Sequence, residues 1–227
     1  LETIFLTFIG GVEPFILIAV PLFIFAGEIL SSGGVGKRIV EFARVLFGWL
    51  PGGLSVIAIG TCAVFTALTG ATGLTIIALG GILLPAMSRG KYPERFSLGL
   101  LTTSGTLGLL FPPSLPLIVY AIVAKVEIGQ LFVAALLPGT LLVVVLSAYS
   151  ILIAARLRVP RKTFRAGELF AAARECIWEL PLPLVVLGGI YTGTFAVSEA
   201  AAITAMYVFV VEVLILSDIR WEVLPEL

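Results

Sequence analysis

The sequence contains no histidine and few charged residues. Of its 227 residues only 12% are Asp, Glu, Lys or Arg, and the formal net charge is zero. The lack of histidine excludes histidine zinc sites, Ser-His and Cys-His dyads and histidine proton relays. Its two cysteines, Cys62 and Cys176, are far apart and are interpreted as small core residues. No basic tract is interleaved with aromatic residues, so we expect no nucleic-acid partner.

Apolar residues dominate the chain instead. Hydrophobic residues make up 59% of it, and the mean hydropathy is +1.16. A soluble domain is about half apolar and about a quarter charged, so a soluble chain could not bury this much apolar surface, whereas a bilayer can accept it. We therefore expect an all-α integral membrane protein. Because the chain begins at Leu1 within apolar sequence, without an initiator methionine, we also expect it to be part of a longer protein.

The first two expected elements are an apolar span and an amphipathic helix. The span covers residues 13–30 and carries two prolines. In the segment 34–47, polar and apolar residues fall on opposite faces of a helix, which is typical of a helix lying at the membrane interface. Its expected polar face carries Lys37, Arg38, Glu41 and Arg44, and its apolar face carries Val40 and Phe47.

The segment 52–87 is apolar but has a polar, glycine-rich centre. Residues 66–73 read Thr-Ala-Leu-Thr-Gly-Ala-Thr-Gly. Each apolar arm has about 14 residues, fewer than the roughly 20 that a spanning helix needs. Basic residues flank both ends of the segment, so the positive-inside rule places both ends on the cytoplasmic side. These features predict a re-entrant helical hairpin.

A second interruption divides the apolar span 96–124. It includes the run Phe111-Pro112-Pro113-Ser114. Pro112 disfavours helical geometry at Phe111, and neither proline can donate a backbone hydrogen bond. We expect Pro113 and Ser114 to open a second half-helix, because proline suits a first turn. The segment therefore predicts a broken transmembrane helix.

The remaining sequence predicts a span over 131–155, a second interfacial helix over 162–178, and two apolar segments over 181–195 and 198–216. The expected domain organisation follows from these boundaries. We expect a scaffold part at residues 1–50, made of a span and an interfacial arm helix. We expect a transport domain made of the re-entrant hairpin at 51–90 and the broken helix at 91–125. A span and a cytoplasmic arm helix should follow at 126–180, and a second repeat should start at 181–227.

We expect the two interruptions to form the binding sites. Non-helical backbone at membrane depth must be buried in protein or line a polar cavity, and broken helices are a recurring binding device of secondary transporters. Carbonyl groups near Thr66 suit a hard cation such as sodium, and N–H groups near Thr72 and Gly73 suit an anion. The alternative is a kinked pair of glycine-rich packed helices whose hydroxyls bond their own i−4 carbonyls.

Three sequence motifs resemble one transporter family. They are FTALTGATG at 65–73, GTLGLLFPPSLPLIVY at 105–120 and GGIYTGTFAVSEAAA at 188–202. Over about residues 14–211 the chain resembles the large membrane (permease, M) subunit of tripartite ATP-independent periplasmic (TRAP) transporters. The resemblance implies an elevator-type fold with two inverted repeats and sodium coupling. It also implies a multi-pass place in the bacterial inner membrane, a small membrane (Q) subunit, and a periplasmic substrate-binding (P) subunit that delivers a small carboxylate, such as a C4-dicarboxylate or sialic acid.

The same resemblance assigns site residues. The expected cation ligands are Thr66, Thr69, Gly70 and Thr72 on the hairpin, and Gly105, Gly108 and Pro112 on the broken helix. The residues expected near substrate are Gly73, Ser104 and Ser114. Sodium is expected as the coupling ion, with no other cofactor and no catalytic residue.

The sequence bears on three other classes of protein. An intramembrane enzyme is disfavoured by the lack of histidine and of paired carboxylates within the predicted spans. A non-transporting membrane scaffold has no need for unwound polar backbone at membrane depth. A channel or another ion-coupled anion transporter stays open, and saturable, sodium-dependent uptake would distinguish a coupled transporter from a channel.

Overall fold

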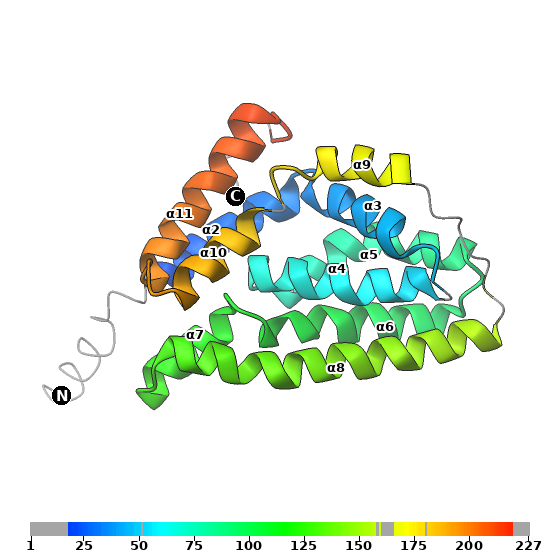
Figure 1. Ribbon diagram of the computed structural model, residues 1–227, viewed down its shortest axis with the longest axis horizontal. Coiled ribbons are helices and arrows are strands. Elements are labelled where there is room, and N and C mark those ends of the chain that lie inside the picture. The colour runs from blue at the N-terminus through cyan, green and yellow to red at the C-terminus, as the bar shows by residue number, and fades with distance from the viewer. Residues whose placement is uncertain (1–17, 51, 158, 160–165, 180, 220–227) are drawn as a thin grey trace, which may run out of the picture.

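The computed structural model describes residues 18–50, 52–157, 159, 166–179 and 181–219, and shows them as packed helices (Figure 1). No β-strand occurs in these ranges, which confirms the all-α prediction. The α-helices are α2 (Ala19–Ser32), α3 (Val35–Phe47), α4 (Gly53–Thr69), α5 (Thr72–Arg89), α6 (Glu94–Leu107), α7 (Leu115–Ala124), α8 (Ile128–Arg156), α9 (Ala166–Glu175), α10 (Pro181–Tyr191) and α11 (Val197–Phe209). A 3₁₀ turn, η2 (Gly108–Leu110), follows α6, and a π-helical turn, η3 (Val210–Ile215), follows α11.

Helices α2 and α3 form a pair bent by 69° at the two glycines between them. The amphipathic helix predicted over 34–47 is present, and Val40 on its apolar face is buried. One of its residues, Arg38, differs from the prediction. Arg38 is not on a solvated face, because its side chain is only 16% exposed and reaches three carboxylates. Phe47, also predicted on the apolar face, is the last residue of the helix and is 38% exposed.

Helices α4 and α5 form the predicted hairpin, but its arms are longer than predicted. They have 17 and 18 residues rather than about 14, and α5 alone is apolar and long enough to cross a membrane. The prediction of short arms was wrong because the threonines near the tip lie within the helices, so that only Gly70 and Ala71 interrupt them. The re-entrant topology stays a prediction that rests on the flanking charges alone.

The predicted broken helix is also present. The segment 94–110 and helix α7 are bent by 42° about the residues between them, and Phe111 has extended backbone (φ −100°, ψ 134°). The start of the second half was predicted slightly wrongly: α7 begins at Leu115, after Ser114. The proline in its first turn is therefore Pro116, and Pro113 lies in the break.

The described part of the chain has three helices long and apolar enough to cross a membrane, at 72–89, 128–156 and 197–215. Counting each bent pair as one span raises the number to five. Helix α8 and the stretch from α11 through η3 fall on predicted spans. Helix α9 covers 166–175 of the second interfacial helix predicted over 162–178, and residues 162–165 of that prediction lie outside the described residues.

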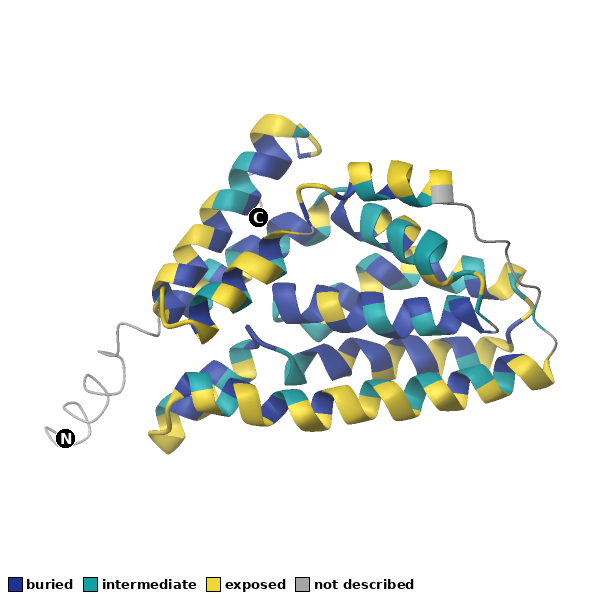
Figure 2. Cartoon of the chain, viewed as in Figure 1, coloured by how far each residue is buried: buried dark blue, intermediate teal, exposed yellow. Residues whose placement is uncertain are grey.

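Helix α4 lies at the centre of the packing and α8 at an edge (Figure 2). Most residues of α4 are buried, because α2, α3, α5, α6 and α8 all pack against it. The outer face of α8 instead exposes large apolar side chains, including Leu137, Val144 and Leu152. Such a face is accommodated by lipid. A second apolar cluster around Phe23 and Phe132 packs α2 against α7, α8, α10 and α11. The central position of α4 brings its end, the hairpin tip, against the broken helix.

Candidate cation and anion site

The hairpin tip is a short left-handed turn between two helix ends. Helix α4 ends at Thr69, and Gly70 has φ +67°, which a residue with a side chain rarely adopts. The Gly70 amide donates to the Thr66 carbonyl at 2.7 Å. This is the last i→i−4 bond of α4, so the carbonyl groups of residues 67–69 accept no hydrogen bond from within the helix. Beyond extended Ala71, the first amides of α5 are left without acceptors in the same way.

Three buried threonine hydroxyls converge just behind this turn. The Thr66 hydroxyl donates to the Thr75 Oγ1 at 2.8 Å, and the Thr75 hydroxyl donates to the Ala71 carbonyl at 3.2 Å. The Oγ1 atoms of Thr69 and Thr75 are 3.4 Å apart. Thr66 and Thr69 were predicted, and Thr75 was missed. Its signal in the sequence was its spacing of three residues from Thr72, which places it in the first turn of α5.

The break between η2 and α7 supplies the facing surface. Pro112, Pro113 and Ser114 are all buried. The Ser114 hydroxyl is fully buried and has no hydrogen-bond partner among the described residues. A buried polar atom without a partner is costly, and it calls for an explanation such as a ligand.

Close contacts join the hairpin tip to the broken helix. A Cβ atom added to Gly108 would lie 2.3 Å from the Thr66 Cβ. One added to Gly70 would lie 2.7 Å from the Leu115 side chain, and one added to Gly105 would lie 2.8 Å from Ile76. At Gly108 the chain therefore approaches α4 more closely than it could if this position carried a side chain. The structure thus places predicted cation-site positions of the two elements against one another, Gly108 against Thr66 and Gly105 beside Thr72. Thr69 and Gly70 complete the hairpin tip, and Pro112 lies in the break.

The three residues predicted near substrate lie in different surroundings. Ser114 lies in the break, with a free hydroxyl. The Ser104 hydroxyl donates to the Leu100 carbonyl at 2.6 Å, which is the i−4 bond of the alternative reading. Gly73 is exposed and faces open space.

A third element contacts the tip and was missed by sequence reasoning. A Cβ atom on Gly27 of α2 would lie 2.6 Å from the Thr69 carbonyl oxygen. Residue Gly27 lies within an apolar span with no motif around it, so only the packing of α2 on α4 reveals the contact.

The donor set fits a small monovalent cation better than a transition metal. Carbonyl and hydroxyl oxygens are hard, uncharged ligands of the kind that sodium takes. The described residues hold no group of three or more His, Cys, Asp or Glu that could bind a metal. The amides at the starts of α5 and α7 are suited to a carboxylate, because helix N-termini attract anions.

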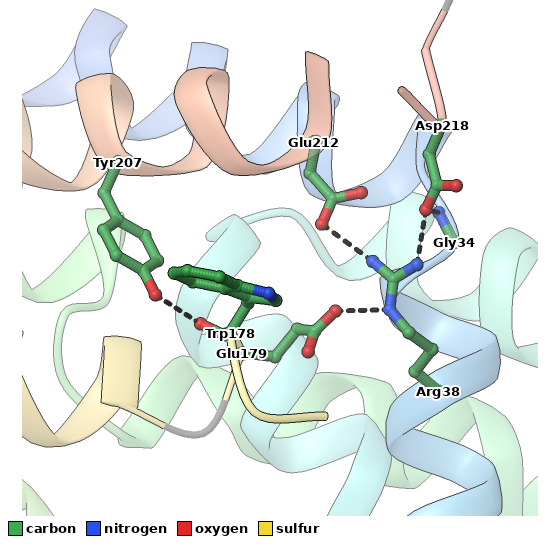
Figure 3. Close-up of polar contacts among 7 residues, drawn as sticks. All are labelled: Gly34, Arg38, Trp178, Glu179, Tyr207, Glu212 and Asp218. Atoms are coloured by element: carbon green, nitrogen blue, oxygen red, sulfur yellow. Dashed lines mark hydrogen bonds and ion pairs between the residues drawn. The ribbon is translucent and has the colours of Figure 1, made fainter. Parts of the chain in front are cut away.

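A second polar cluster is formed by other residues (Figure 3). Arg38 of α3 contacts the carboxylates of Glu179, Glu212 and Asp218, which come from the C-terminal part of the chain. Glu212 is 1% exposed within the apolar stretch 197–215. Sequence reasoning missed it, although a lone carboxylate in an apolar span is itself a functional signal.

Comparison with known proteins decides the family. The family model of the tripartite ATP-independent periplasmic transporter, DctM component, matches residues 1–227. The chain belongs to this family. The resemblance read from the three motifs is therefore confirmed, and the curated relatives are named as transporter permeases rather than enzymes.

Several TRAP permeases are similar over most of the chain. The C4-dicarboxylate TRAP transporter large permease protein DctM of Pseudomonas aeruginosa is 38% identical over 218 residues, covering 94% of this chain and 50% of the relative. The ectoine TRAP transporter large permease protein TeaC of Halomonas elongata is 34% identical, covering 97% and 52%. The sialic acid TRAP transporter large permease protein SiaM of Vibrio cholerae is 34% identical, covering 88% and 47%. The chain spans about half the length of these curated relatives.

Proposed function

We propose that the chain is part of the permease subunit of a sodium-coupled TRAP transporter in the bacterial inner membrane. The transporter would import a small carboxylate, such as a C4-dicarboxylate or sialic acid. Relatives of this chain are named for both of these substrates. A periplasmic binding protein would deliver the substrate, and a small membrane subunit would complete the membrane part.

One observation carries the proposal: the hairpin tip packs directly against the break of the second helix. Gly108 lies against Thr66, and Gly70 lies against Leu115. Two interrupted helices that meet in this way gather carbonyls, hydroxyls and helix N-termini at one place. A bound cation there would supply the positive charge that an anionic substrate needs, without an arginine clamp.

We also propose an elevator-type movement, in which the hairpin and the broken helix travel together against the remaining helices. The close contacts at Gly105 and Gly108 support this, since they make the two elements one packed unit. Such a unit could carry cation and substrate across the bilayer as a rigid body.

The test is sodium-dependent uptake by the full-length permease, reconstituted with its partner subunits in proteoliposomes. Thr69→Val keeps the side-chain shape and removes one hydroxyl. Losing about 1–2 kcal/mol of ligand interaction should raise the sodium concentration for half-maximal uptake by about five- to thirty-fold. Thr140→Val is the matched control, because the Thr140 hydroxyl is exposed on α8 and bonds the Leu136 carbonyl.

Different outcomes would count against different parts of the proposal. Uptake that needs no sodium in the unmodified protein would refute sodium coupling and favour another ion-coupled anion transporter. Absence of uptake with all subunits present would favour a non-transporting scaffold. Equal sodium dependence in Thr69→Val and Thr140→Val would remove the Thr69 hydroxyl from the ligand set.

A further inference from the structure

A single arginine is shared by three carboxylates at the junction of α3 with the C-terminal helices (Figure 3). Each guanidinium nitrogen of Arg38 donates to a different residue: Nε to Glu179, Nη2 to Glu212 at 2.8 Å, and Nη1 to Asp218. The π-helical turn η3 and the left-handed Ser217 (φ +55°) bring Glu212 and Asp218 to the same guanidinium. The cluster ties α3 to two segments that lie more than 140 residues later, as the separations of 141 and 174 residues show.

The charges in this cluster do not balance. Among the residues that the structure describes, one positive group faces three acids, which would leave two excess negative charges if all three were ionised. The Asp218 side chain is 30% exposed, so water can solvate it, but the side chains of Glu179 and Glu212 are only 5% and 1% exposed. A buried unpaired carboxylate is strongly disfavoured, and such a group is normally neutralised.

Two oxygens of the cluster have no partner. Oε2 of Glu212 and Oε2 of Glu179 are buried and make no hydrogen bond within the described part of the chain. Oε2 of Glu212 faces the backbone of α2: it lies 2.5 Å from the position of a Cβ on Gly33, and that same position is 3.2 Å from the Ile29 carbonyl oxygen. Oε2 thus points at the backbone where α2 ends.

The space beside the two glutamates is too apolar for a metal ion, and the described residues hold no group of three or more His, Cys, Asp or Glu that could bind one. The cavity that they line has a volume of about 10 Å³, which is at the lower limit for one water. Its other walls are formed mainly by Leu30, Val35 and Leu182 and their neighbours. A hard cation needs several oxygen ligands, and this wall cannot supply them. A proton needs only one oxygen.

We propose that this cluster is a proton-binding site and that Glu212 holds the proton on Oε2. In this arrangement Oε1 of Glu212 still accepts from Arg38, and the excess buried charge falls by one. The charged and titratable groups that face Glu212 are Arg38 from α3, Glu179 from the segment before α10, and Asp218 after η3. Just after α2 it meets Gly33.

The proposal concerns residues other than those of the hairpin tip and does not depend on sodium coupling. Its consequence is that the tie between α3 and η3 responds to pH. The folded protein would hold a proton that the unfolded chain releases, so its stability should fall as the pH rises toward the point where Glu212 ionises.

The test uses pH-difference infrared spectroscopy on the full-length permease in detergent. We expect the carbonyl stretch of a protonated carboxyl at neutral pH, which disappears at higher pH. This band should be absent from Glu212→Gln and retained in Glu199→Gln. Glu199 is the matched control because its exposed carboxylate accepts from the Ala196 amide at 2.9 Å. A band that persists in Glu212→Gln, or is lost in Glu179→Gln instead, would overturn the assignment.

Thermal unfolding supplies an independent readout. Glutamine has the shape and neutrality of a protonated glutamic acid, so Glu212→Gln should fold with an unchanged or higher Tm. Its Tm should also lose part of the pH dependence that the unmodified protein shows between about pH 5 and pH 8. A Glu212→Gln variant that is much less stable than the unmodified protein at every pH would mean that an ionised Glu212 is required, and the proposal would be wrong.

Discussion

Replacing Gly108 by alanine is the sharpest probe of the contact between the hairpin and the broken helix. The new Cβ would lie 2.3 Å from the Thr66 Cβ and 2.6 Å from the Ala63 carbonyl oxygen. Unstrained carbon atoms sit at least about 3.5 Å apart, so the two helices would have to separate by about 1 Å. Both obstacles are backbone or Cβ atoms, which cannot rotate away.

The expected cost follows from two opposing effects. Overpacking of this kind destabilises by about 1–3 kcal/mol. Gly99 of α6 is the control, since a Cβ there meets nothing within 4 Å. Gly99→Ala should stabilise the helix by up to about 1 kcal/mol. The two variants should therefore differ by about 1–4 kcal/mol. Gly105→Ala should fall between them, because its nearest neighbour is the movable Ile76 side chain at 2.8 Å.

Equilibrium unfolding of the purified full-length permease measures these differences, and sodium-dependent uptake measures their effect on function. We expect Gly108→Ala to lose uptake more severely than Gly105→Ala, with Gly99→Ala unaffected. If Gly108→Ala were as stable and as active as Gly99→Ala, the hairpin and the broken helix would not be in contact in the working protein, and the candidate site would be wrong.

Two further predictions concern topology and thiol chemistry. Cysteines that replace the exposed residues Trp49 and Arg89 should be labelled by a membrane-impermeant reagent from the same side of the membrane, and a cysteine at Lys125 from the other side. Labelling of Trp49→Cys and Arg89→Cys from opposite sides would refute the re-entrant hairpin. Burial raises the pKa of the Cys176 thiol to about 12. Maleimide should therefore react slowly with Cys176 up to about pH 9, while Lys125→Cys reacts faster as the pH approaches about 8.5; equal rates would show that Cys176 is accessible.

The sequence by itself determined the class of protein and the positions of the helix breaks. An apolar chain with 12% charged residues can be placed only in a bilayer. The breaks followed from local backbone chemistry: Gly70 tolerates a left-handed turn, and Pro112 keeps Phe111 extended. Such effects act over a few residues, so a single sequence shows them directly. The motifs around them were specific enough to indicate the family, which comparison confirmed.

Tertiary structure decided everything that joins distant segments. No local rule indicated that Gly108 lies on Thr66, that Gly27 lies against the Thr69 carbonyl, or that Arg38 meets Glu212, 174 residues away. Even the length of the hairpin arms depended on packing, because α4 is surrounded by other helices and stays regular through its polar threonines. Local propensity sets where a helix can bend, but the close packing of whole helices sets which bends meet and which charges are buried together.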